Sequence, residues 1–156
     1  MSFNSYDWAS RIKAVESEYW AARFAIDYWK KSVRNDPTLL QIANRTIQRQ
    51  NIQLKALDIS NASYQLEGTY IIRLFAEFET CMRLYWRMRV RETRPRAEEL
   101  LRNLATRCHV PNDALAGVND VREYRNSLVH ERENAQASVA IDIARGYVCR
   151  FVSHLL

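Results

Sequence analysis

A long amphipathic pattern opens the chain. Between residues 6 and 33, large apolar side chains recur at intervals of three and four, as on one face of an α-helix; they are Trp8, Ile12, Val15, Tyr19, Ala22, Ile26, Trp29 and Val33. A second apolar stripe of Trp20, Phe24 and Tyr28 falls on the opposite side of the same helix. A helix that is apolar on two sides is expected to be covered on both, either inside a bundle or at a contact between subunits.

The middle of the chain predicts two more helices. Asp36 and Pro37 suit the cap and first position of a second helix, which is expected to continue to a break near residues 58–61. A third helix is predicted over residues 63–91. It carries the heaviest apolar face in the sequence and is expected to form the centre of the core with Ile71, Leu74, Phe75, Phe78, Met82, Tyr85 and Trp86.

Three shorter helices are predicted in the remaining third of the chain. The first covers residues 95–109, with Leu100, Leu101 and Leu104 pointing inward. The next ends near residue 130 and has an apolar stripe of Val121, Tyr124 and Leu128; the last is expected to bury Ala140, Ile143, Tyr147, Phe151 and Leu155.

This pattern predicts an all-α fold, a five- or six-helix up-and-down bundle built as one domain over residues 1–156. Only three glycines and three prolines are present, which disfavours a turn-rich β fold. Apolar residues make up 47% of the chain, so an ordered core is expected.

Several kinds of site are not indicated. Cys81, Cys108 and Cys149 are odd in number, far apart and set among apolar neighbours, as buried reduced thiols would be. No cluster of metal ligands and no glycine-rich phosphate loop is visible, so neither a metal nor a cofactor is expected. Without a long apolar run or a signal peptide, a cytoplasmic protein outside the membrane is the default expectation.

Positive charge concentrates between residues 83 and 107. This segment holds eight arginines and three glutamates, so its net charge is +5, the same as the net charge of the whole chain. Such a segment suits a polyanion, and the candidate RNA-binding residues are Arg87, Arg89, Arg91, Arg94 and Arg96. The alternative is an ordinary solvated loop and helix face.

Three chemically useful side chains lie close together near a predicted helix end. Asn126 and His130 are four residues apart on the face away from the apolar stripe, and Arg125 lies on its flank. Histidine transfers protons near neutral pH, arginine stabilises phosphate charge, and asparagine can orient either the imidazole or the substrate. The helix dipole at this end favours imidazolium, which would help His130 donate a proton.

Spacing alone carries little weight here. With 19 arginines in the chain, an arginine followed by histidine at this loose spacing is expected about once by chance, and Arg102 with His109 is a second match. His109 precedes Val110 and Pro111, so it is interpreted as a residue that ends a helix. On these residues alone, a solvated helix face that ends in His130 is the simpler interpretation.

The stretch Arg125-Asn126-Ser127-Leu128-Val129-His130 resembles the Arg-x(4–6)-His motif of the HEPN superfamily. A Glu-x3-Lys/Arg pair on an earlier helix is common in that family, and Glu79 with Arg83 matches it. The order of elements is also similar, with the motif in the penultimate helix. Glu79 and Arg83 are expected either to form an exposed pair or to include a buried link from Glu79 to Arg125.

The resemblance implies a dimeric bundle of HEPN type and a metal-independent endoribonuclease, perhaps of the kind found in toxins and antiphage defence systems. It assigns catalysis to Arg125, Asn126 and His130, with Glu79, Arg83 and Arg122 in support. RNA, a second copy and a neutralising protein are the implied partners. The alternative is a non-catalytic HEPN-like module for dimerisation, RNA binding or protein binding.

One position departs from the pattern of HEPN toxins that are paired with nucleotidyltransferase antitoxins. Those toxins usually carry, two residues after the histidine, a tyrosine that the partner modifies. This chain has Arg132 there. Silencing by modification of that tyrosine is therefore not expected for this protein.

Overall fold

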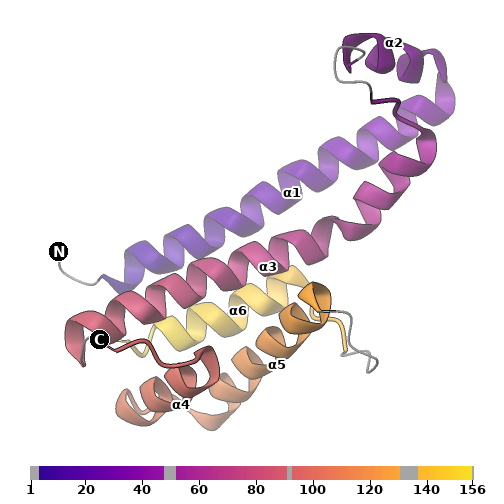
Figure 1. The fold of residues 1–156 in the computed structure, drawn as a ribbon. Coiled ribbons are helices and arrows are strands. Elements are labelled where there is room, and N and C mark those ends of the chain that lie inside the picture. Colours follow the sequence, from indigo (N-terminus) through magenta and orange to yellow (C-terminus); the bar gives the residue numbers. More distant parts are fainter. Residues whose placement is uncertain (1–3, 48–51, 91–92, 131–136, 156) are drawn as a thin grey trace. The chain divides into compact units, whose positions relative to one another are not determined.

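The computed structural model describes residues 4–47, 52–90, 93–130 and 137–155. Six helices and no strands are found in these ranges, which confirms the all-α prediction (Figure 1). The helices are α1 (Ser5–Asn35), α2 (Thr38–Ile47), α3 (Ala56–Arg89), α4 (Ala97–Arg107), α5 (Asn112–Val129) and α6 (Ile141–Val152). None of them is long and apolar enough to cross a membrane.

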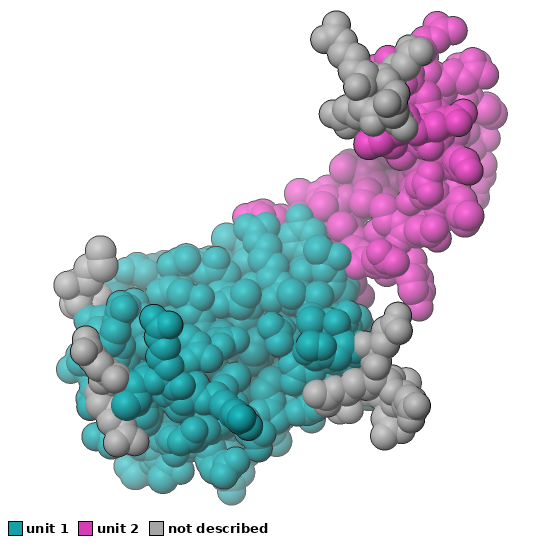
Figure 2. All heavy atoms as spheres, viewed as in Figure 1, with its two compact units in different colours: residues 1–17, 68–156 teal, residues 18–67 magenta. Residues whose placement is uncertain are grey.

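The chain forms two compact units, which are coloured separately in Figure 2. Unit 1 comprises residues 1–17 and 68–156, and unit 2 comprises residues 18–67. Both long helices, α1 and α3, contribute a segment to each unit. Each unit is described by itself below.

The core of unit 1 is built on the C-terminal part of α3, as its apolar face predicts. All seven inward residues predicted for that helix are buried, and Phe78 and Met82 are fully inaccessible. Phe78 packs edge-to-face on Phe75 and on Phe151 of α6, with ring centroids 5.7 and 5.5 Å apart. From α4, Leu100, Leu101 and Leu104 complete this core.

Helix α6 presents a face that is rotated from the predicted one. The structure buries Phe151 and Leu155 as predicted, but Ile143 is 49% exposed and Ala140 is exposed. The buried residues at the start of the helix are Ile141, Ala144 and Val148 instead. Both choices fit a spacing of three and four, so the packing against α3 and α5 decided between them.

Unit 2 is a helical hairpin with α2 at its turn. Arg23 of α1 donates to the backbone carbonyl of Ser63 on α3 (3.0 Å), and the buried Ser63 hydroxyl donates to Asp27 (3.3 Å). Asp36 caps α2 by accepting from the Thr38 backbone N–H at 3.0 Å, as the sequence predicted. The helix break lies earlier than predicted: residues 52–55 are not helical, and Asp58 accepts from the Lys55 N–H at the start of α3.

The second apolar stripe of α1 is not covered within unit 2. Trp20, Phe24 and Tyr28 are 54%, 76% and 66% exposed. Within the described residues this removes one of the two predicted explanations, burial between helices of the same unit. A contact between subunits stays a prediction.

Candidate functional site

The predicted catalytic residues gather at the end of α5 in unit 1. Helix α5 ends at Val129, and His130 follows as its C-cap with extended backbone angles (φ −118°, ψ 121°). The backbone N–H of His130 still donates to the carbonyl of Asn126 at 2.9 Å, which holds the histidine one turn from the asparagine. His130 is exposed, so its ring is open to a ligand. Because its backbone has left the helix, its side chain does not continue the helical face of Asn126.

Arg125 is held between the core and the asparagine. Its Nη1 donates to Oδ1 of Asn126 at 3.0 Å, and its guanidinium carbon lies 5.9 Å from the ring centroid of Phe75. Its Nε is buried and has no hydrogen-bond partner among the residues that the structure describes. This part-buried cation at the helix end therefore contacts the predicted asparagine and still holds an unused donor.

Glu79 and Arg83 settle into the pair that their spacing predicts. Arg83 donates to the same Glu79 oxygen from Nε (2.8 Å) and Nη2 (2.5 Å), and its Nη1 donates to the Pro95 carbonyl at 3.1 Å. The predicted alternative, a hydrogen bond between Glu79 and Arg125, is not formed. Glu79 accepts from Arg83, and Arg125 donates to Asn126 instead. Arg83 thus fastens the loop before α4 onto α3.

Arg122 lies apart from the helix end. Its side chain is only 13% exposed and forms ion pairs with Glu98 of α4 (3.4 Å) and Glu123 (2.6 Å). Eight residues of α5 separate it from His130, about 12 Å along the axis. At this helix end Arg125 contacts Asn126, and His130 is joined to Asn126 through a backbone hydrogen bond, while Arg122 joins α5 to α4.

Two apolar side chains border the same helix end. Leu128, predicted to face the core, is 39% exposed and lies over Gly68 of α3, and Val129 is 46% exposed. The prediction for Leu128 was therefore wrong: it contacts α3 at Gly68 but remains at the surface. An apolar border thus flanks the candidate site.

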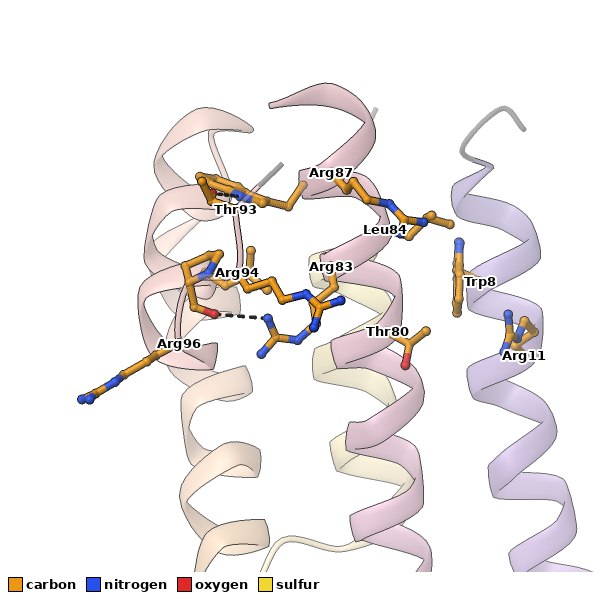
Figure 3. Close-up of a pocket in the computed structure, with 12 residues that line it drawn as sticks. Trp8, Arg11, Thr80, Arg83, Leu84, Arg87, Thr93, Arg94 and Arg96 are labelled. Carbon is orange, nitrogen blue, oxygen red and sulfur yellow. Dashed lines mark hydrogen bonds between the residues drawn. The ribbon is translucent and has the colours of Figure 1, made fainter. Parts of the chain in front are cut away.

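The predicted RNA-binding arginines occupy the other end of α3. Arg87 and Arg89 are exposed in its last turn, and Arg94 and Arg96 are exposed in the loop that leads to α4. Arg91 lies outside the described residues, as does Arg132. With Trp8 and Arg11 of α1, three of these arginines line a cavity of about 820 Å³ (Figure 3). The contribution of α1 was missed from the sequence because those residues are more than seventy positions away.

The cavity and the histidine are well separated along α3. Leu128 and Arg125 lie beside Gly68 and Phe75, whereas the cavity is formed at Arg83 and Arg87. At 1.5 Å per residue, the twelve residues from Gly68 to Thr80, the lining residue of α3 nearest to it, correspond to about 18 Å. The cavity and the contact of Leu128 with α3 are therefore separate places on this helix.

Of the three cysteines predicted to be buried thiols, only Cys81 is buried. Burial raises the pKa of the Cys81 thiol to about 12, so this side chain stays protonated at neutral pH. Cys108 and Cys149 are partly exposed, and none of the three forms a disulfide. Within the described residues, no three histidine, cysteine or acidic side chains are grouped so as to hold a metal ion.

Comparison with protein-family models, curated proteins and solved structures yields no match to this chain.

Proposed function

We propose that this protein is a metal-independent endoribonuclease of HEPN type. The observation that carries the proposal is the arrangement at the end of α5. There, Arg125 contacts Asn126 directly and an exposed His130 is fastened one turn away. A cation, an amide and an imidazole that can transfer protons are components that suit phosphodiester cleavage. The resemblance of the same six residues to the HEPN motif supports this choice.

The proposed reaction is a transesterification within the RNA strand. The ribose 2′-oxygen attacks the adjacent phosphorus, the bond from phosphorus to the 5′-oxygen breaks, and a 2′,3′-cyclic phosphate remains. His130 accepts the proton of the 2′-hydroxyl or supplies the proton that the leaving 5′-oxygen takes up. Arg125 holds the phosphate oxygens as charge builds on them, and Asn126 positions the guanidinium.

A homodimer belongs to this proposal. His130 is exposed in a single chain, and a shallow surface leaves reacting groups in water. A two-fold partner placed against Leu128 and Val129 would bury the apolar border of the site and bring two copies of His130 into one enclosed cleft. A toxin or antiphage role, with a protein that neutralises it, is the biological setting that the family resemblance favours.

The test is the chemistry of the products. Purified protein incubated with RNA in EDTA is expected to leave 2′,3′-cyclic phosphate ends and to leave DNA intact, because DNA lacks the attacking hydroxyl. His130→Ala should lower the cleavage rate about 10²–10⁴-fold, the usual effect of losing a positioned proton-transfer group. Its melting temperature should change little, because the side chain is exposed.

His109→Ala is the matched control for the histidine. It removes another exposed histidine that lies at the same loose spacing from an arginine, and cleavage should stay at the wild-type rate. Equal cleavage by the wild type and His130→Ala would assign the activity to another site or a contaminant. The non-catalytic HEPN-like module would then be the better reading.

A further inference from the structure

The cavity at the C-terminal end of α3 carries a second inference. The twelve described residues that line it belong to unit 1 and include five arginines, Arg11, Arg83, Arg87, Arg94 and Arg96, and none of these twelve is an aspartate or a glutamate. Its volume of about 820 Å³ is within the range of small-molecule sites and well beyond what a bare phosphate needs. The lining therefore combines positive charge with room for an organic group.

The five arginines are not equivalent. Arg11 forms an ion pair with Glu77 (2.8 Å), and Arg83 donates hydrogen bonds to Glu79 and to the Pro95 carbonyl. Arg87, Arg94 and Arg96 have no ion pair among the described residues, and all three are exposed. In Figure 3, Arg87 extends toward Trp8, whereas Arg96 points away from the other side chains. Arg87 and Arg94 are thus the cations best placed to receive an anion in the cavity.

The other wall is apolar and firmly held. Trp8 and Trp86 are 7% and 4% exposed, and the guanidinium carbon of Arg11 lies 4.1 Å from the ring centroid of Trp8. The indole N–H of Trp86 donates to the Thr93 hydroxyl (3.0 Å), which ties the loop before α4 to α3. Leu84 and Pro95 complete this apolar surface. Nucleobases pack on apolar surface and stack on guanidinium groups, so the partly exposed Leu84 and Pro95 and the Arg11 guanidinium over Trp8 offer contacts to a base. Arginines without an ion pair can bind its phosphates in bidentate fashion.

We propose that this cavity binds a terminal nucleotide, with its phosphate on Arg87 and Arg94 and its base on the Trp8 and Leu84 side. None of its lining residues belongs to α5, and about 18 Å of α3 lies between Gly68, which contacts Leu128, and Thr80 of the cavity, so it is distinct from the proposed cleavage site. The same chemistry is offered by a free nucleotide and by the phosphorylated 5′ end of an RNA. Nucleotide binding here does not depend on the proposed ribonuclease activity.

Calorimetric titration of the full-length protein with ADP tests the proposal at fixed ionic strength. Saturable binding of one nucleotide per chain is expected. Arg87→Gln and Arg94→Gln should each weaken it about tenfold or more, the usual effect of losing a charge-assisted contact. Arg89→Gln is the matched control, because it removes the same charge from an exposed position of the same turn that does not line the cavity; its effect should be under about twofold.

Three results would overturn the assignment: no saturable binding, an equal loss in Arg89→Gln, or inorganic pyrophosphate bound as tightly as ADP. The last would mean that the apolar wall contributes nothing. Competition experiments with the His130→Ala variant distinguish a free nucleotide from an RNA 5′ end as the ligand. This variant is used because it should not cleave the RNA during the measurement. If ADP displaces a 5′-phosphorylated oligonucleotide but not its 5′-hydroxyl twin, the cavity holds an RNA end. If ADP binds but displaces neither oligonucleotide, the cavity holds a free nucleotide.

Discussion

His109 and His130 both follow the end of a helix, but the backbone φ angle is positive at His109 and negative at His130. His109 has a positive φ of 52°, the left-handed conformation that side chains with a Cβ rarely adopt. The Val110 N–H donates to the Ala105 carbonyl at 2.9 Å, which closes the usual C-terminal turn around that residue. The sequence interpretation of His109 as a helix-ending residue is confirmed. A strained turn position suits a structural role better than proton transfer.

His109→Gly should therefore stabilise the protein, because glycine takes positive φ without a steric penalty. The expected gain in the free energy of unfolding is about 1 kcal/mol, measured by urea denaturation. His109→Ala, which keeps the penalty, should give no comparable gain. A glycine variant less stable than the wild type would mean that the imidazole makes a contact worth more than the strain.

At the scale of elements, α5 is positioned by contacts with three helices, α3, α4 and α6. Gly117 lies against the Tyr147 ring of α6, and Gly68 of α3 lies under Leu128. Arg122 joins α5 to Glu98 of α4, and Arg150 of α6 pairs with Asp113 at the other end (2.7 Å). These contacts set where the last turn of α5, and therefore His130, is presented.

Gly117→Ala should be destabilising even though alanine favours helices. An added Cβ would lie 2.6 Å from the Tyr147 Cγ, so α5 and α6 would have to move apart. The expected loss is about 1–3 kcal/mol of unfolding free energy, as for other overpacked cores. Gly146→Ala is the control, because open space surrounds that position and helix propensity should make it neutral or slightly stabilising. Equal stability of both variants would show that the α5–α6 contact is loose.

At the scale of the whole molecule, two exposed apolar surfaces compete as subunit contacts. One is the border of the candidate site, Leu128 and Val129, and the other is the α1 stripe of Trp20, Phe24 and Tyr28. The first belongs to unit 1 and borders His130, whereas the stripe belongs to unit 2. Dimerisation through the first surface would link assembly to the proposed cleavage.

Light scattering at tens of micromolar protein is expected to give the mass of a dimer. Val129→Glu should produce monomers and abolish RNA cleavage together, because it places two like charges at the proposed two-fold contact. Phe24→Glu, which adds the same charge to the stripe, should leave both mass and cleavage unchanged. Monomers from Phe24→Glu but not from Val129→Glu would move the interface to α1 and contradict the enclosed cleft.

Local pattern was sufficient for much of this protein. The spacing of apolar residues predicted α1, the core face of α3 and the inward leucines of α4, because each depends on a periodicity contained in one helix. The cap at Asp36 and the helix end at His109 were visible for the same reason: their determinants lie within a few residues. The grouping of Arg125 with Asn126 and His130 likewise needed only one helical turn.

What tertiary structure decided depends on partners that are distant in the sequence. Whether α6 turned Ile143 or Ala144 inward was set by its neighbours, since both fit the same period. Leu128 is exposed although it contacts Gly68 of α3, a neighbour that is sixty residues away in the sequence. Arginines that cannot be told apart by local pattern make different contacts: Arg83 bonds the loop before α4, Arg122 pairs with Glu98 of α4, and Arg87 lines a cavity that Trp8 of α1 completes. Periodicity within a helix follows from its own geometry, whereas the surface that a side chain meets is chosen by packing between helices.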